Sequence, residues 1–289
     1  MPSSPTPVHL PDPVPESDLL DALAGFVIKH DVTVLSGAGA STESGIPDYR
    51  GPQTRDRDRS PMRYRDFISS AGARRHYWAR SAIGWASFSA ATPNAGHEAL
   101  AELERSGCIR GVVTQNVDGL HQAGGSRRVV ELHGTLAEVV CLDCGRTEAR
   151  TSFQERLLDR NPGWLSRAAA LAPDGDADLS PEETNHFEVA NCSQCGGPIK
   201  PNVVFFGEDV PDTWTRDAWD LVNDADALLV VGSSLTVYSG FRFVRAAAKA
   251  NRPVAIVNLG ETRGDALATI RIDGRTGTVL PRLANLLGT

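Results

Sequence analysis

Two pairs of cysteines place the strongest constraint on what this chain can fold into. Cys141 and Cys144 are separated by two residues, as are Cys192 and Cys195, and a glycine follows each pair. A two-residue spacer lets two thiolates reach one ion, and glycine permits the tight turn that follows. Two such pairs supply the four ligands of a closed tetrahedral zinc site, which is structural in character. The sequence therefore predicts that these distant segments meet at one structural Zn²⁺ ion.

The alternative for these cysteines is a pair of disulfides or redox-active dithiols. The 47 residues between Cys144 and Cys192 exceed the spacing of a compact zinc ribbon, which indicates further folded structure in the gap. The start of the chain lacks the basic-then-apolar pattern of a signal peptide, so we expect a cytoplasmic protein, and that setting favours metal over disulfides. Cys108, the fifth cysteine, is expected to be a small core residue.

Short apolar runs, each ending in small or polar residues, recur along the chain. A helical pattern starts at Asp18, and the runs 32–35, Ile109–Thr114, Ala227–Val231 and Val254–Asn258 are rich in β-branched residues. Strands that alternate with helices imply a parallel sheet with helices on both faces, so the predicted fold class is a Rossmann-like α/β sheet. Ligands of such sheets bind outside the carboxyl ends of the strands, where four loops are expected to converge.

Two stretches do not follow this pattern and predict an inserted module. We expect a nucleotide-binding domain made of residues 18–51, 96–136 and 200–289, and a small helical and zinc-binding module made of residues 52–95 and 137–199. Residues 1–17 carry six prolines and little apolar content, which predicts a flexible tail. A ligand role for the tail is the alternative, because proline-rich segments can be recognised by partners.

Charge and composition exclude several function classes. The chain has 29 Lys and Arg against 36 Asp and Glu, a formal net charge of −7. No broad basic surface is therefore expected for a nucleic acid. No apolar run approaches the about 20 residues of a membrane-spanning helix, so no membrane partner is expected. Hydrophobic residues make up 41% of the chain, enough for a globular core. The sequence does not indicate an oligomeric state.

The glycine-rich loop after the first predicted strand becomes informative through what surrounds it. Gly37-Ala38-Gly39 alone is compatible with many nucleotide-binding folds or with a structural turn. The run GAGASTESGIPDYRG at residues 37–51, however, closely resembles the NAD signature of the sirtuin family, with Tyr49 where many members have phenylalanine. The segments TQNVDGLH at 114–121, ELHGT at 131–135 and KPNVVFFGE at 200–208 follow in the order typical of the family. The resemblance spans residues 18–285.

Finer details resemble the class II sirtuins of the mitochondrial lipoamidase and deacylase type. The segments concerned are 75–80, 171–176 and 232–240. No arginine or lysine occurs in the first 17 residues, so a mitochondrial transit peptide is not evident and a bacterial-type cytoplasmic setting fits better. The resemblance implies an NAD-dependent protein-lysine deacylase that consumes NAD, releases nicotinamide and transfers the acyl group to ADP-ribose. Its partners would be acyl-lysine proteins or peptides.

The resemblance also assigns roles to residues. His133 would be the general base on a ribose hydroxyl, because neutral imidazole suits proton transfer near pH 7, and His121 is the competing candidate. Asn116, counted with His133 as catalytic, would orient the ribose, and Asp118 the carboxamide. The alternative for this segment is a plain turn. The expected NAD-binding residues are Gly37, Ala38, Gly39, Ala40, Ser41, Glu43, Ile46, Pro47, Asp48, Tyr49, Arg50, Gln115, Asn116, Val117, Asp118, His133, Gly232, Ser233, Ser234, Asn258, Leu259, Gly260 and Thr276.

A tyrosine and an arginine three residues apart bear on the acyl group. Tyr77 and Arg80 resemble a pair that grips the carboxylate of succinyl or glutaryl lysine in a related class II group, and arginine suits a carboxylate because it donates two parallel hydrogen bonds. The alternative is a surface helix with Tyr77 packed inward and Arg80 solvated. By resemblance, the substrate peptide lies extended between residues 204–208 and 232–240. The expected substrate-binding residues are Tyr77, Arg80, Val204, Phe205, Phe206 and Gly207.

Other functions use the same features. A mono-ADP-ribosyltransferase shares the step in which nicotinamide leaves, and a non-catalytic NAD sensor would keep the fold and the zinc pairs. The joint presence of Asn116, Asp118 and His133 argues against a sensor. A nicotinamide-dependent oxidoreductase is disfavoured, because no candidate hydride partner and no usual glycine pattern followed by an acidic ribose ligand are present.

Overall fold

Continuous apolar runs build the larger of two sheets, as the sequence predicts. The computed structural model describes residues 17–48, 61–167 and 176–289, so the predicted site residues Tyr49 and Arg50 and most of the predicted tail lie outside the described residues. Six parallel strands lie in the order β3-β2-β1-β7-β8-β9. Their bounds are β1 Val32–Ser36, β2 Ile109–Thr114, β3 Val129–Glu131, β7 Ala227–Val231, β8 Val254–Asn258 and β9 Ile270–Asp273.

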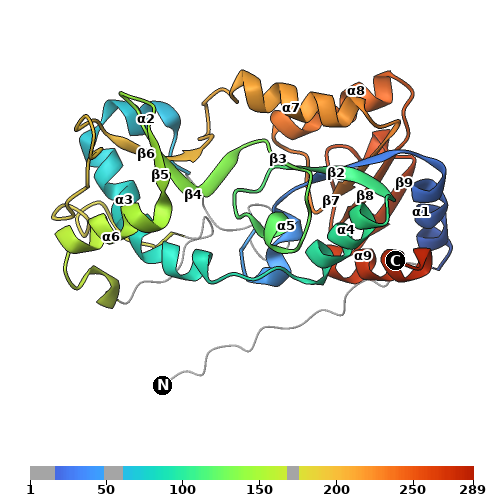
Figure 1. Ribbon diagram of the computed structural model, residues 1–289, viewed down its shortest axis with the longest axis horizontal. Helices are drawn as coiled ribbons and strands as arrows, with labels where there is room; N and C mark the ends of the chain where they lie inside the picture. The colour runs from blue at the N-terminus through green and yellow to red at the C-terminus, as the bar shows by residue number, and fades with distance from the viewer. Residues whose placement is uncertain (1–16, 49–60, 168–175) are drawn as a thin grey trace.

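Helices cover both faces of this sheet (Figure 1). They are α1 Ser17–Lys29, α4 Ala95–Arg105 and α9 Thr276–Leu287 on one face, and α7 Asp212–Asn223 and α8 Tyr238–Lys249 on the other. Successive side chains of a strand point to opposite faces. Val34 accordingly joins the core under α1, α4 and α9, whereas Leu35 joins the core under α7 and α8. Burial on both faces explains why β7 and β8 are apolar along nearly their whole length, whereas Arg110 on β2 is exposed.

The strand order changes direction at the boundary between β1 and β7. From β1 it proceeds through β2 to β3 on one side, and later through β7, β8 and β9 on the other. The loops after β1 and β7 therefore diverge and leave a crevice at the carboxyl ends of these two strands. Gly37 begins the first loop and Gly232 the second, and the short helix α5 Leu120–Ala123 follows the loop after β2.

A second core belongs to the smaller part of the molecule, on the left of Figure 1. An antiparallel sheet of order β5-β4-β6 packs with three helices, and both predicted insertions contribute to this core, Trp78 from one and Phe153 from the other. The elements are α2 Tyr64–Ser69, α3 Ala71–Ser89, β4 Gly134–Cys141, β5 Thr147–Ala149, α6 Arg150–Arg160 and β6 Ile199–Val203. The division of the chain into domains at the predicted boundaries stays a prediction.

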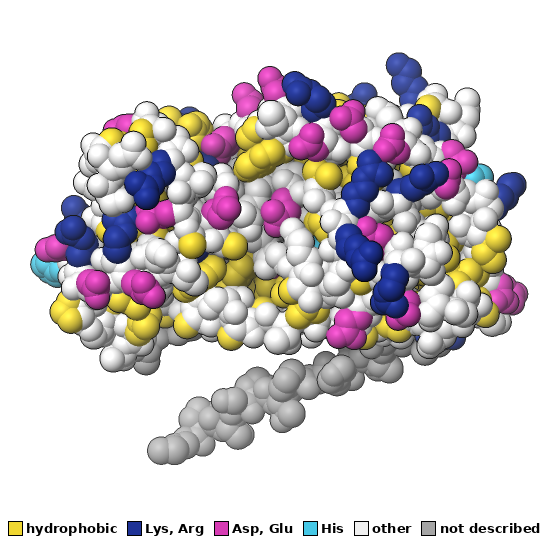
Figure 2. All heavy atoms as spheres, in the orientation of Figure 1, with side chains coloured by type: hydrophobic (Ala, Val, Ile, Leu, Met, Phe, Trp, Pro, Cys, Tyr) yellow, Lys and Arg dark blue, Asp and Glu magenta, His cyan; other side chains and the backbone are white. Residues whose placement is uncertain are grey.

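The described surface carries charges of both signs. Figure 2 shows Lys and Arg side chains interspersed with Asp and Glu over the visible face. Arg110 pairs with Asp31, and Arg128 with Asp224, at 2.6 and 2.7 Å. Across residues 17–48, 61–167 and 176–289, the structure has no helix with the length and apolar composition that a bilayer crossing requires.

Candidate functional site

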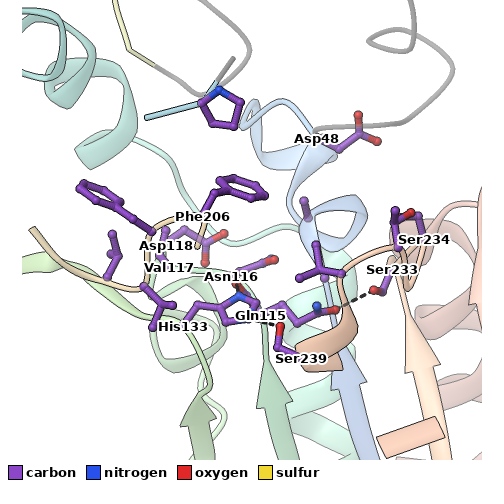
Figure 3. Close-up of a pocket in the computed structure, with 18 of the residues that line it drawn as sticks. Asp48, Gln115, Asn116, Val117, Asp118, His133, Phe206, Ser233, Ser234 and Ser239 are labelled. Atoms are coloured by element: carbon purple, nitrogen blue, oxygen red, sulfur yellow. Dashed lines mark hydrogen bonds between the residues drawn. The ribbon is translucent and has the colours of Figure 1, made fainter. Parts of the chain in front are cut away.

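A cavity of about 1120 Å³ opens at the carboxyl ends of the parallel strands, between the sheet and the smaller part. Most of the predicted cofactor and substrate residues line it. Those that the structure brings together are Gly37, Ala38, Gly39, Ser41, Ile46, Pro47, Asp48, Gln115, Asn116, Val117, Asp118, His133, Gly232, Ser233, Ser234, Asn258, Leu259 and Gly260, with Tyr77, Arg80, Val204, Phe205, Phe206 and Gly207. Figure 3 shows several of them converging from separate loops.

Of the predicted cofactor residues that the structure describes, three do not line the cavity. Ala40 is buried, and the carboxylate of Glu43 accepts a hydrogen bond from the Gly277 backbone N–H at 2.8 Å. Thr276 begins α9, is 2% exposed, and its hydroxyl has no hydrogen-bond partner among the described residues. Contacts of these three residues with NAD stay predictions.

Two glycine loops pack back to back at the floor of the cavity. The Gly39 N–H donates to the Gly232 carbonyl at 2.7 Å. A Cβ at Gly37 would stand 2.7 Å from the Cβ of Ser233, and a Cβ at Gly39 would stand 2.8 Å from the Gly232 oxygen. Both distances are shorter than van der Waals contact, so these positions need glycine. The close approach leaves the space above the loops open for a ligand.

His133 follows β3 and has hydrogen-bond partners for both ring nitrogens. Its Nδ1 lies 3.0 Å from the Gln115 carbonyl oxygen, and its Nε2 lies 2.7 Å from the Ser239 hydroxyl (Figure 3). Burial is the main cause that lowers the pKa of His133 below its usual value; the Gln115 carbonyl opposes this shift and the Arg242 charge adds to it. The ring is therefore neutral near pH 7, the form that a general base requires.

Asn116 and Asp118 are held by one serine. The Asn116 amide donates to Ser41 Oγ at 3.0 Å, and the Ser41 hydroxyl donates to Asp118 Oδ2 at 2.7 Å. Asp118 Oδ1 also accepts from the Leu120 N–H at 2.9 Å, and Gly119 has φ 72°. The segment is thus a turn, which was the alternative interpretation of its sequence. This turn presents two polar side chains to the cavity.

His121 lies below the cavity and does not line it. It is 1% exposed, and its Nε2 lies 2.7 Å from the Ser36 hydroxyl on β1. Burial, with the neighbouring His97, lowers the pKa of His121 to about 3. The geometry therefore favours His133 over His121 as the residue that exchanges protons with a ligand.

The predicted acyl-binding pair lies on α3 at the other end of the cavity. Tyr77 is 8% exposed and its ring meets those of Phe67 and Phe205 at centroid distances of 5.5 and 5.3 Å. Arg80 is half-buried, and its Nε donates to the Ala177 carbonyl at 2.8 Å. Tyr77 packs inward, as the surface-helix alternative expects, but Arg80 also lines the cavity. Both side chains can therefore meet a ligand.

The segment predicted to bind peptide follows β6 and is hydrogen-bonded to two other segments of the chain. The Val204 N–H donates to the His133 carbonyl at 2.9 Å, and the Tyr64 N–H donates to the Phe206 carbonyl at 3.1 Å. Arg63 and Phe206 form an isolated parallel bridge. The segment is thus held by His133 and by residues 63–64, and residues 204–207 line the cavity together with the loop after β7.

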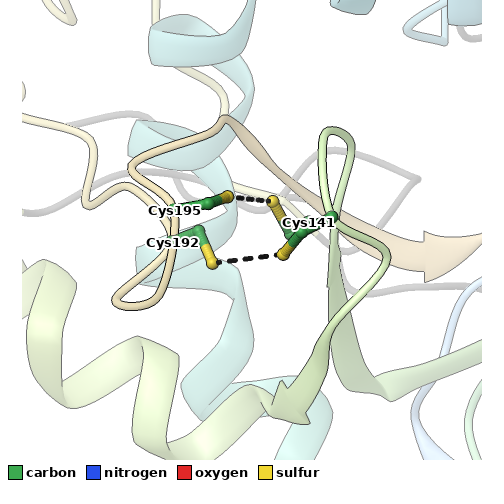
Figure 4. Close-up of side chains that lie close together, drawn as sticks. Cys141, Cys192 and Cys195 are labelled. Atoms are coloured by element: carbon green, nitrogen blue, oxygen red, sulfur yellow. Dashed lines mark hydrogen bonds between the residues drawn. The ribbon is translucent and has the colours of Figure 1, made fainter.

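The four cysteines meet as predicted (Figure 4). Cys141 Sγ lies 3.4 Å from Cys195 Sγ, Cys144 Sγ lies 3.8 Å from Cys192 Sγ, and all four sulfurs lie within 4.8 Å of one another. A tetrahedron with Zn–S bonds of 2.3 Å has edges of about 3.8 Å, whereas a disulfide needs about 2.05 Å. The donor set therefore fits one structural zinc ion and not two disulfides.

Among the cavity residues that were not predicted individually, two bear directly on His133. Ser239 and Arg242 lie in the first turns of α8 and face the cavity beside His133. A serine at the start of an amphipathic helix carries no sequence signal of its own. The one available signal was its place at the end of the loop 232–240, which was assigned to the peptide cleft as a whole.

Comparison with known proteins decides the family. The Sir2 family model matches residues 37–239, more than two thirds of the chain. The chain belongs to the Sir2 family. The prediction of the sirtuin family, made from four short motifs, is confirmed.

The relatives of this Sir2-family chain cover nearly its whole length. NAD-dependent protein deacetylase 1 of Streptomyces coelicolor is 54% identical over 257 residues, which are 89% of this chain and 86% of the relative. The mitochondrial NAD-dependent protein lipoamidase sirtuin-4 of Homo sapiens is 49% identical over 277 residues, 93% and 88% of the two chains. The solved structure described as "Sir2-p53 peptide-NAD+" superposes with a TM-score of 0.75 at 30% identity and covers 93% of this chain and 98% of its own.

Proposed function

We propose that this chain is an NAD-dependent protein-lysine deacylase that transfers the acyl group to ADP-ribose and releases nicotinamide. The observation that supports it most is the neutral His133 ring beside Asn116 and Asp118 in one cavity. Family membership and relatives named as NAD-dependent deacetylases and lipoamidase support the same reaction class.

The cavity fits NAD in size and in wall chemistry. Its volume of about 1120 Å³ exceeds that of most small-ligand pockets, which span roughly 300–1,000 Å³. The loops of Gly37 and Gly232 provide the side-chain-free surface that a phosphate-bearing ligand needs. When bound, NAD would supply a nicotinamide leaving group and the ADP-ribose that takes over the acyl group.

The residues of the cavity have separate roles in this reaction. His133 accepts a proton at Nε2 from a hydroxyl of the bound ligand, because its neutral form is the stable one in the buried site. Asn116 can donate and accept hydrogen bonds, and the Asp118 carboxylate can accept from an amide N–H. Ser41 fixes both at 3.0 and 2.7 Å, so they need little reorganisation when a ligand arrives.

The zinc site would hold the smaller part together and take no part in the reaction. Its four ligands are thiolates, which leaves no open position for a substrate. None of the four cysteines lines the cavity. The backbone N–H groups of Gln194 and Gly197 each donate to a cysteine sulfur at 3.4 Å, as expected of a thiolate ligand turn.

We further propose a preference for acidic acyl groups such as glutaryl or methylglutaryl lysine. The support is that Tyr77 and Arg80 both line the cavity, where an arginine can donate hydrogen bonds to a carboxylate. Arg80→Met should lower kcat/KM on acidic acyl peptides about tenfold or more and leave acetyl peptides within about twofold, because only the former lose a charged hydrogen bond. Arg80→Lys is the matched control that keeps the charge. Equal losses on acetyl and acidic acyl peptides would contradict the preference.

Mass spectrometry tests the reaction itself. Purified protein would be incubated with NAD and acetyl, succinyl, glutaryl, methylglutaryl and lipoyl lysine peptides, with His133→Ala in parallel. Acyl-ADP-ribose and nicotinamide should appear with the native protein, and His133→Ala should lose about a hundredfold or more in rate. Protein-bound ADP-ribose without deacylated peptide would instead indicate an ADP-ribosyltransferase, and no NAD consumption would indicate a sensor.

A further inference from the structure

The hydrogen bonds of His133 determine which ring nitrogen carries the proton. A backbone carbonyl can only accept, so the 3.0 Å contact with the Gln115 oxygen requires a hydrogen on Nδ1. In the neutral ring Nε2 then has a lone pair, and the 2.7 Å contact with Ser239 requires the serine hydroxyl to donate. Both nitrogens are thus occupied, and the ring has one tautomer and one orientation.

The start of α8 is fixed against the same residue that holds the other side of the ring. A Cβ at Gly240 would stand 2.5 Å from the Gln115 amide nitrogen, so the helix approaches Gln115 as closely as a glycine allows. The Ser233 hydroxyl donates to Gln115 Oε1 at 2.7 Å (Figure 3). Gln115 therefore holds Nδ1 through its backbone and sets the position of Ser239 through its side chain.

One turn further along α8, Arg242 acts on the same ring through its charge. Residues three apart on a helix share a face, and Arg242 is a cause of the lowered pKa of His133. Its guanidinium donates to the Thr215 hydroxyl at 3.3 Å and lies over the Phe243 ring, while its Nε has no partner among the described residues. Ser239 thus acts on the His133 ring through a hydrogen bond, and Arg242 acts on it through its charge.

We propose that Ser239 is a positioning residue for the general base: its hydroxyl holds the His133 ring, whose Nδ1–H tautomer Gln115 sets, in one orientation and pairs with Nε2 in both protonation states. The inference rests on the proposed role of His133. Because the Ser239 hydroxyl occupies the Nε2 lone pair, a ligand proton reaches the ring through it: the ligand O–H bond breaks as a new O–H bond forms at Ser239 Oγ, and the serine's former proton moves to Nε2. The Ser239 hydroxyl then accepts a hydrogen bond from Nε2–H. Alanine cannot do this, and threonine can.

Ser239→Ala should weaken the base in a defined direction. Hydrogen bonds to a charged partner are about twice as strong as neutral ones, so losing the hydroxyl harms the imidazolium more than the neutral ring. The pKa of His133 should fall further, by about half a unit or more. We expect the acid limb of the kcat profile to move to lower pH, kcat to fall about five- to tenfold, and the KM values for NAD and peptide to change less than kcat. Ser239→Thr should restore kcat.

Nuclear magnetic resonance gives a readout that does not depend on turnover. Imidazole ¹⁵N shifts of His133 should report the Nδ1–H tautomer that Gln115 sets, and their pH titration should give a lower pKa of His133 in Ser239→Ala than in the native protein and in Ser239→Thr. Arg242→Met should move the pKa of His133 upward, opposite to Ser239→Ala, because it removes a repelling charge. An unchanged pKa of His133 in Ser239→Ala, with kcat within twofold of native, overturns the proposal. A native protein that shows the tautomer but no deacylation would overturn the proposed function and leave the positioning role standing.

Discussion

A polar cluster around two buried histidines supports the cavity from below. His97 Nδ1 accepts from the Asn94 N–H at 3.3 Å, so its Nε2 carries the hydrogen and points to Ser41 Oγ at 3.5 Å. The ring of His97 meets that of His121 at a centroid distance of 4.8 Å. Ser41 in turn holds Asn116. These histidines are structural supports of the site, and burial lowers the pKa of both.

His121 makes folding stability depend on acid. Its pKa is about 3 in the folded state and about 6.5 in the unfolded chain. The unfolded chain therefore binds more protons between these values, and stability falls as pH drops below about 6.5. At pH 5 the loss is about 2 kcal/mol from this residue. His121→Gln should remove that loss, so urea denaturation at pH 7 and pH 5 should show a smaller difference for the variant than for the native protein. Equal differences would refute the assignment.

The sequence predicted the central side chains of the site and missed their supports. His133 and Asn116 stand in motifs that carry chemistry, so they could be found without a structure. Ser239, Arg242 and His97 act through geometry, because their partners are 106, 109 and 56 residues away along the chain, at His133, His133 and Ser41. No local pattern encodes such pairings.

At the scale of elements, three buried strands were predicted with their bounds, and β1 extends one residue beyond the predicted run 32–35. Ala227–Val231 and Val254–Asn258 are apolar along nearly their whole length because helices cover both faces, whereas Ile109–Thr114 also carries the exposed Arg110. The edge strands β3 and β9 were not predicted. Val129–Glu131 is three residues long and only half-buried, and Ile270–Asp273 is partly exposed, so neither has a clear hydrophobic period.

The turn after β6 is held by a buried lysine. Lys200 is 4% exposed, and its ammonium lies 3.1 Å from Glu208 Oε2 and donates to the carbonyls of Pro201 and Val203. Glu208 Oε2 also accepts from the Phe205 N–H at 2.8 Å. This ion pair therefore fixes the shape of the segment between its two partners, which is the predicted peptide-binding segment.

Lys200→Met should loosen that segment. The change leaves the Glu208 carboxylate largely buried without its cation, at a stability cost of about 3 kcal/mol, and should raise the peptide KM several-fold more than the NAD KM. Adding Glu208→Gln should recover much of the loss, because the unpaired charge is gone. Urea denaturation and peptide and NAD titrations of both variants provide the measurement. A double variant no better than the single one would show that the carboxylate charge is not the cause.

At the scale of the whole molecule, the zinc site joins the two ends of the second insertion. Cys141 ends β4, whereas Cys192 and Cys195 precede β6, and both strands belong to the small sheet. The ion would thus close the chain between Cys141 and Cys195 into a loop, and it would also hold the two cysteine turns together. The free energy of zinc binding becomes folding free energy of this part.

Zinc removal should unfold the smaller part before the larger one. With a strong chelator, hydrogen exchange should rise first in β4, β5 and β6, while β1, β7 and β8 stay protected because their cores contain no cysteine ligand. The melting temperature should fall by several degrees or more, and added Zn²⁺ should restore it. Simultaneous loss of protection in both sheets would mean that the two parts unfold as one unit.

The back-to-back packing of the Gly39 and Gly232 loops has a consequence for engineering. A side chain at Gly39 would displace the loop after β7, which leads through Ser233 to Ser239 and the start of α8. The glycine loops under the proposed NAD site and the segment that carries Ser239 therefore have to move together. Redesigning this protein to accept an altered dinucleotide would require both loops to be varied together, because a library confined to either loop alone would mostly sample sequences that misplace the other.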